Sequence, residues 1–160
     1  MADSGSIAPV IQGIGLIVGW AVVHRLSAAR DIDKARREMI GKAADSLSDE
    51  VTKLFIVAKD YHTCDRSEDK EILIKMSLQD LAGRVVLLGN AADQVSELSM
   101  CSRSVQAMRQ AITGEHFEDE HAGKISLASP QISQITDEVL RAKRALQELK
   151  HNQFPPARKK

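Results

Sequence analysis

The stretch SPQISQITDEVLRAKRALQEL, residues 129–149, contains the clearest helix pattern in the chain. Ser129 and Pro130 are typical of a helix start, because the hydroxyl can accept a backbone hydrogen bond and proline suits the first helical position. Apolar residues then recur every three or four positions, as on one helix face: Ile132, Ile135, Val139, Ala142, Leu146 and Leu149. We therefore expect a helix over residues 130–151 that buries one face.

The composition favours an all-α protein. Aromatic residues make up only 3% of the 160 residues, and helix-favouring types dominate. Lys+Arg and Asp+Glu both number 22, and this zero formal charge argues against a nucleic-acid partner, which usually requires a basic excess on one face. Cys64 and Cys101 lack the spacing of a disulfide framework or a metal knuckle.

The same periodicity predicts three further helices upstream. One covers residues 25–63 and continues directly from the segment before it, and a second covers residues 66–98, starting at a capping pattern formed by Asp65 and Glu68. The apolar positions expected on the buried stripe of the second helix are Ile72, Leu73, Met76, Leu81, Val85 and Leu88. This apolar phase continues through Gly89, so we expect the chain to bend at residues 99–104 and a shorter helix to follow at 103–113. A break at Gly89 and Asn90, which could serve as a stop and cap, remains the alternative.

Three long amphipathic helices cannot bury their apolar stripes alone, which predicts an antiparallel three-helix bundle or a coiled-coil-like hairpin. The short connection after residue 63 makes the first two helices antiparallel. We therefore expect the second helix to bring the acidic loop, residues 114–128, close to the basic residues between 25 and 42.

The glycine-bearing run IQGIGLIVGWAVVHR, residues 11–25, decides where the protein resides. Residues 4–24 carry no formal charge, and about 21 helical residues span roughly 31 Å, the thickness of the hydrocarbon core of a bilayer. After a short segment, residues 1–6, we expect a transmembrane helix at 7–24. A cleaved signal peptide and a buried helix of a soluble bundle remain alternatives.

Basic residues predict the orientation of this span. Arg25, Arg30, Lys34, Arg36, Arg37 and Lys42 follow it, whereas only Asp3 precedes it. By the positive-inside rule the N-terminus lies outside, the helical domain at residues 25–151 is cytoplasmic, and residues 152–160 form a basic flexible tail. The residues expected at the inner membrane interface are Trp20, His24, Arg25 and Arg30.

One face of the predicted span carries small residues and a single amide, which favours packing against another membrane helix. Its members are Ala8, Gln12, Gly15 and Gly19, spaced four, three and four residues apart. We expect the protein to be attached to the membrane. We also expect it either to associate with itself or to bind a protein partner through its helical tail.

The strongest metal candidate is EHFEDEH, in which His116, Glu118, Glu120 and His121 could supply imidazole and carboxylate ligands. We favour a solvated acidic loop, because the segment has no enforced geometry. His62 and Cys64 also suggest a Cys–His nucleophile, yet acidic neighbours make an ordinary turn the better interpretation. With no other catalytic or phosphate-binding motif, we expect no enzyme activity, no metal and no cofactor.

The segments VGWAVVHRLSAARDIDKARREM, YHT, MRQAITGEHFE and SPQISQI resemble those of uncharacterised bacterial single-pass membrane proteins that have an N-terminal membrane helix and a helical cytoplasmic tail. The resemblance implies a bacterial inner-membrane setting. It does not imply any particular activity. Three hypotheses follow: a non-enzymatic interaction or assembly module, a membrane sensor or effector switched at the acidic loop, and an envelope-spanning protein of the phage-lysis type with an external tail.

Overall fold

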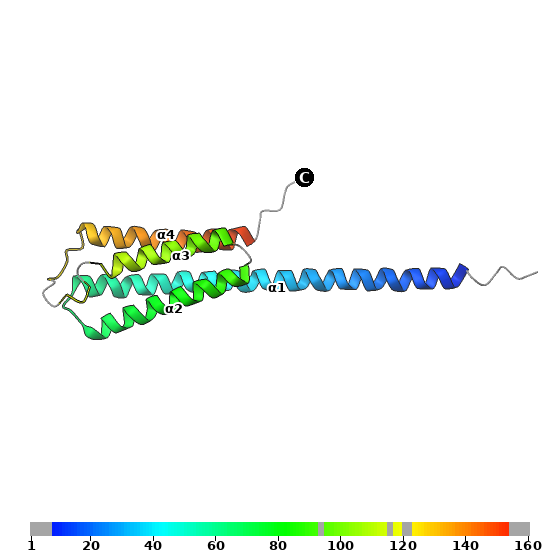
Figure 1. Cartoon of the computed structure of the whole chain (residues 1–160), viewed down its shortest axis with the longest axis horizontal. Coiled ribbons are helices and arrows are strands. Elements are labelled where there is room, and N and C mark those ends of the chain that lie inside the picture. Colours follow the sequence, from blue (N-terminus) through cyan, green and yellow to red (C-terminus); the bar gives the residue numbers. More distant parts are fainter. Residues whose placement is uncertain (1–7, 93–94, 115–116, 120–122, 154–160) are drawn as a thin grey trace, which may run out of the picture. The chain divides into compact units, whose positions relative to one another are not determined.

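A computed structural model describes residues 8–92, 95–114, 117–119 and 123–153, with the backbone alone at residues 8–22, 92, 95, 97 and 153. It contains four helices and, within these ranges, no strand: α1 (Ala8–Thr63), α2 (Glu68–Ala92), α3 (Val95–Ile112) and α4 (Pro130–Gln153) (Figure 1). The chain divides into two compact units, residues 1–38 and 39–160. The all-α prediction is confirmed.

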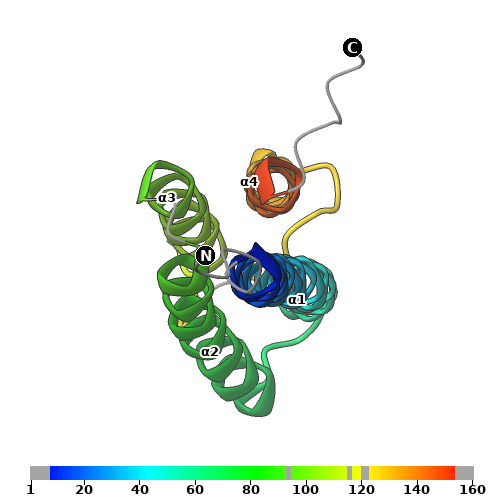
Figure 2. The same ribbon diagram turned by 90° about the vertical axis from the view of Figure 1, so that its right-hand side faces the viewer.

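The unit at residues 39–160 is a bundle of four helices, each antiparallel to the one before it (Figure 1). Side-chain bonds place α1 beside both α2 and α4: Arg84 contacts Glu50, and Lys150 contacts Asp45. α3 has the same two neighbours, because it also packs against α2 and α4 (Figure 2). The compact unit begins at Met39, later than residue 25, where the pattern placed the start of the helical domain.

The apolar stripes of the four helices form one core. All six stripe residues predicted for α4 are buried, and so are Leu47, Val51, Leu54, Ala58 and Tyr61 of α1. The start of α4 also follows its prediction, because the backbone N–H of Ile132 donates to the Ser129 hydroxyl at 3.3 Å. The α4 positions were predictable because this helix presents one continuous apolar face.

The predicted boundary of the second helix is wrong. α2 ends at Ala92 and α3 begins at Val95, so no bend separates residues 99–104 from the preceding part of α3, and the expected helix at 103–113 begins eight residues earlier. A Cβ added to Gly89 would overlap the side chain of Leu98, so glycine allows α3 to pack closely over the end of α2. The expected three-helix bundle therefore becomes a four-helix bundle.

The extra reversal also overturns the predicted position of the acidic loop. Because α3 runs back along α2, the loop begins at the end of the bundle where α1 finishes. The backbone N–H of Ile125 donates to the carbonyl of His62 at 2.9 Å, and Lys124 forms an ion pair with Asp65 at 3.0 Å. The sensor hypothesis stays a prediction. The predicted start of the second helix at residue 66, next to Asp65, also differs from the structure. α2 begins at Glu68, and Asp65 forms an ion pair with Lys124.

The unit at residues 1–38 contains the first part of α1. Within the described part of the chain, no helix is long and apolar enough to cross a membrane, so the structure does not support the span predicted at 7–24. The side chains of Ala8, Gln12, Gly15, Gly19 and Trp20 lie outside the described residues, and their roles stay predictions.

Candidate functional site

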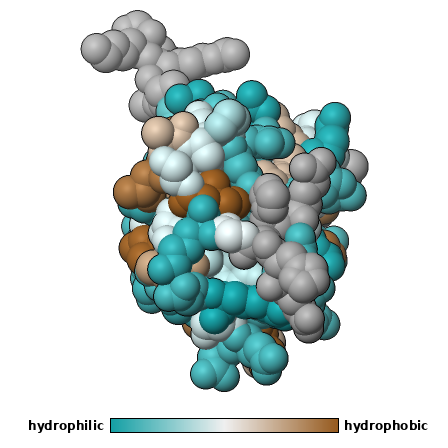
Figure 3. All heavy atoms as spheres, turned by 90° about the vertical axis from the view of Figure 1, so that its left-hand side faces the viewer, coloured by the Kyte–Doolittle hydropathy of each residue, from teal (hydrophilic) through white to brown (hydrophobic). Residues whose placement is uncertain are grey.

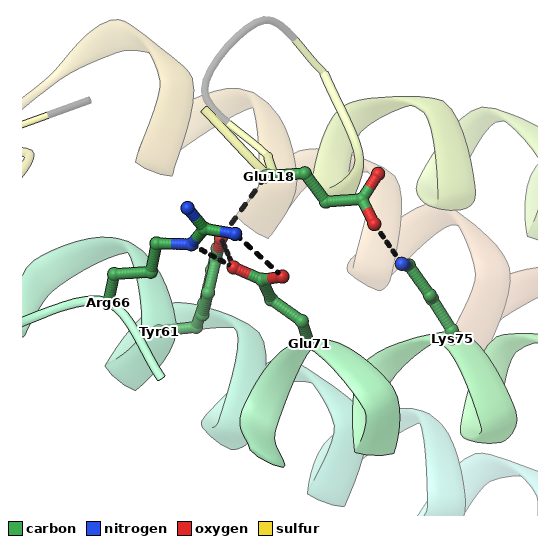
Figure 4. A network of polar contacts seen from close by, with 5 residues as sticks. All are labelled: Tyr61, Arg66, Glu71, Lys75 and Glu118. Atoms are coloured by element: carbon green, nitrogen blue, oxygen red, sulfur yellow. Dashed lines mark hydrogen bonds and ion pairs between the residues drawn. The ribbon is translucent and has the colours of Figure 1, made fainter. Parts of the chain in front are cut away.

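A cluster of polar side chains joins α1, α2 and the acidic loop at one end of the bundle (Figure 4). Tyr61 comes from the last turn of α1, Arg66 from the connection, and Glu71 from the first turns of α2. The Tyr61 hydroxyl donates to Glu71 Oε1 at 2.8 Å. Arg66 donates from Nε to Oε1 at 2.6 Å and from Nη2 to Oε2 at 3.3 Å. We call these three residues the polar cluster.

The acidic loop is tied to the polar cluster through Glu118 and Phe117. The backbone N–H of Glu118 donates to the Tyr61 hydroxyl at 3.2 Å, and its carboxylate pairs with Lys75 (Figure 4). The rings of Phe117 and Tyr61 lie 5.2 Å apart, and Lys75 Nζ lies 5.9 Å from the centre of the Phe117 ring. Glu118 has a φ of 66°, a left-handed conformation that is uncommon outside glycine. The Tyr61 hydroxyl thus accepts a hydrogen bond from the loop and donates one to Glu71.

The electrostatics of the polar cluster suit a structural role. Hydrogen bonding from Arg66 lowers the pKa of Glu71 against the opposing effect of burial, and Tyr61 adds to this lowering. Burial, reinforced by Glu71, raises the pKa of Tyr61 to about 12. Glu71 is therefore ionised and Tyr61 neutral at pH 7, and neither has the pKa near 7 that favours general acid or base catalysis.

His62 and Cys64 do not form a nucleophilic pair. The buried His62 ring donates from Nε2 to the carbonyl of Ile112 at 2.9 Å and meets the Tyr61 ring edge-on at 5.1 Å. Cys64 is exposed, and its thiol donates to the Asp60 carboxylate at 3.1 Å. A hydrogen bond from Lys70 is the main cause of the lowered pKa of Asp60. The thiol therefore bonds a carboxylate and not the His62 imidazole, as in an ordinary turn.

The predicted metal candidates are only partly visible. Glu118 pairs with Lys75, while His116, Glu120 and His121 lie outside the described residues. Among the residues that the structure does describe, no three His, Cys, Asp or Glu side chains gather closely enough to hold a metal ion. Of the predicted membrane-interface residues, His24, Arg25 and Arg30 are exposed.

A second feature, which the periodicity missed, is an exposed apolar surface on α2. Its buried stripe consists of Ile74, Leu78, Leu81, Val85 and Leu88. Apolar residues on the opposite side are between 50% and 68% exposed: Ile72, Leu73, Met76, Val86 and Leu87. The prediction that Ile72, Leu73 and Met76 belong to the buried stripe is wrong, because α2 has apolar residues on two faces. We call the five exposed residues the α2 ridge.

The loop end of the molecule has a different character from the α2 ridge. Among the residues drawn in colour at this end, most are hydrophilic, and the hydrophobic ones form separate patches (Figure 3). Large apolar side chains placed together in water mark interaction surfaces more often than scattered ones do. The α2 ridge is therefore the candidate functional site.

Comparisons with protein-family models, with curated proteins and with solved structures gave no match.

Proposed function

We propose that this protein is a non-enzymatic interaction or assembly module, anchored in the bacterial inner membrane by residues 7–24 with its helical domain in the cytoplasm. The observation that carries the proposal is the α2 ridge, five large apolar side chains that the bundle leaves in water. Burying apolar surface contributes about 25 cal/mol per Å². A complex in which a partner covers the α2 ridge would therefore be stabilised by this burial.

The membrane anchor rests on the sequence. Residues 4–24 are uncharged, and basic residues crowd the C-terminal side of this run. The stripe formed by Ala8, Gln12, Gly15 and Gly19 is of the kind that lets two membrane helices approach closely. Assembly through the span and assembly through the cytoplasmic bundle would then reinforce each other.

The polar cluster supports a non-enzymatic role. Glu71 accepts hydrogen bonds at both of its oxygens from groups of the same chain, and Tyr61 contacts both Glu71 and the backbone of Glu118. Side chains that hold a loop in this way stabilise the end of the bundle. An enzyme would instead need polar groups directed at a substrate.

Topology reporters on the full chain test the anchor and its direction. We expect an inactive C-terminal alkaline phosphatase fusion, a fluorescent C-terminal green fluorescent protein fusion, and recovery of both in the membrane fraction after alkaline extraction. An active phosphatase would place the tail outside, as the envelope-spanning hypothesis requires. Recovery in the soluble fraction would contradict the anchor itself.

Chemical cross-linking of the full chain in membranes tests the assembly role. The expected result is a cross-linked species larger than the monomer, formed by two copies or by the chain and a co-purifying protein. A chain that stays monomeric and cross-links to nothing would contradict the proposal.

A further inference from the structure

The exposed face of α2 follows the spacing of a helix-pairing seam. Ile72, Met76, Gln79, Gly83 and Val86 are all exposed and follow one another at steps of four, three, four and three residues. This alternation keeps residues on one side of a helix and is the repeat by which two helices pack side by side. The outer face of α2 thus has the geometry to accept a second helix along its length.

Gly83 lies within this face without an intrachain reason to be glycine. A Cβ added there would meet no atom within 4 Å, in contrast to Gly89. Glycine inside an exposed helix is less favourable than alanine. A shallow hollow surrounds it, lined by Met76, Gln79, Asp80, Gly83, Arg84 and Leu87. Close approach of another helix would fill the hollow and explain the glycine.

Charged residues beside the seam indicate the identity and the direction of the second helix. Lys75 comes directly before Met76 and Asp80 directly after Gln79, so they lie on opposite flanks of the seam and five residues apart. In a parallel pair of helices, residues at these two positions meet across the interface. Two copies of α2 would therefore form two Lys75–Asp80 pairs. In an antiparallel pair each flank meets the same flank of the other helix, and the opposite charges stay apart.

We propose that two copies of this chain pair in parallel through the α2 seam, with Met76, Gly83 and Val86 facing their counterparts across a two-fold axis along the helices. Such an interface uses the same surface in both copies, as two-fold dimers do. The parallel direction leaves the Met39 ends of both bundles on the same side. The inference rests on the proposed function in this respect, because two copies in one membrane need that direction.

The contacts that Lys75 and Asp80 make within one chain do not oppose this pairing. Lys75 pairs with Glu118, and Asp80 lies 3.8 Å from Arg84. Both pairs are at least one-third exposed, and exposed ion pairs contribute little to stability. Exchanging them for contacts across the interface costs little.

Disulfide trapping in membranes tests the register and direction. Met76→Cys and Val86→Cys are introduced separately into the full chain carrying Cys64→Ser, since Cys64 is the exposed native thiol and Cys101 is buried. Under mild oxidation we expect both variants to shift from monomer to dimer on a non-reducing gel, because a disulfide needs Cα atoms about 4.4–6.8 Å apart. Leu140→Cys, on α4, is the matched exposed control and should stay monomeric.

A charge exchange tests the identity of the partner. Lys75→Glu alone and Asp80→Lys alone place like charges across the interface, and each should cause loss of the Met76→Cys dimer. The double variant restores opposite charges and should restore the dimer. A purely structural role of either residue within its own chain would not produce this rescue. Circular dichroism of each variant checks that the helices remain folded.

The outcomes separate this inference from the proposed function. If only one of the two cysteine positions trapped a dimer, the pairing would be antiparallel or out of register, and the proposal would be wrong. If neither trapped a dimer while the chain still cross-linked to itself or another protein in membranes, the α2 pairing would fail and the assembly role would stand. A soluble, wholly monomeric chain would defeat both.

Discussion

Leu98 of α3 lies directly over Gly89 of α2, where a Cβ on residue 89 would overlap its side chain. This contact explains how the chain reverses a few residues later without a gap between the two helices. Gly89 also has a matched control on α2, because a Cβ added to the exposed Gly83 would meet no atom within 4 Å.

Replacing Gly89 with alanine is expected to destabilise the bundle by about 1–3 kcal/mol, the usual cost of overpacking. Chemical unfolding of the full chain in mild detergent, followed by circular dichroism, measures the change. Gly83→Ala is the control and should be neutral or stabilise the dilute monomer by up to about 1 kcal/mol, because alanine favours helix. Equal losses from both variants would show that close packing at Leu98 is not the cause.

Tyr61 is the only tyrosine in the chain, so its ionisation can be followed directly. With its pKa raised to about 12, the near-ultraviolet band of tyrosinate should appear about two pH units later in the folded chain than in denaturant. The raised pKa stabilises the folded state below the ordinary value near 10, and this contribution is lost as the pH rises towards 12. Glu71→Gln should lower the midpoint. A folded-state midpoint at the ordinary value would refute the bond to Glu71.

The lowered pKa of Glu71 predicts a loss of folding stability at acid pH, whereas the raised pKa of Tyr61 predicts a loss at alkaline pH. The lowered pKa of Glu71 stabilises the folded state above the ordinary glutamate value of about 4.3, and this contribution disappears as the pH falls below that value. The free energy of unfolding should therefore decline more steeply with acid in the native chain than in Glu71→Gln. Identical acid slopes, measured by urea unfolding across this range, would contradict the ion pair between the buried Glu71 carboxylate and Arg66.

Ser129→Ala should cost about 0.5–2 kcal/mol, because the hydroxyl accepts the Ile132 N–H at the start of α4. Ser129→Gly should cost only a few tenths of a kcal/mol. Ser133→Ala, one turn later at an exposed helical position, is the matched control and should not destabilise the chain. Thermal unfolding of the three variants compares them, and a loss of similar size at Ser133 would contradict the capping role.

Periodicity and capping signals were sufficient for the parts of the fold in which a helix has one apolar face. The stripe from Ile132 to Leu149 is buried at every predicted position, and α4 starts where Ser129 and Pro130 indicate. Such signals are local, since they depend on helix geometry and on backbone groups within a few residues of each other. For the same reason the all-α class followed directly from the composition.

Other features depended on contacts between distant residues. Periodicity cannot tell which of two apolar faces of α2 is buried, and it assigned Ile72 and Met76 to the core although both are exposed. Gly89 is compatible with a continuing helix, and only the packing of Leu98 against it shows why α3 can turn back there. That reversal placed the acidic loop beside Tyr61 and left the α2 ridge in water, because burial is decided by which helices become neighbours.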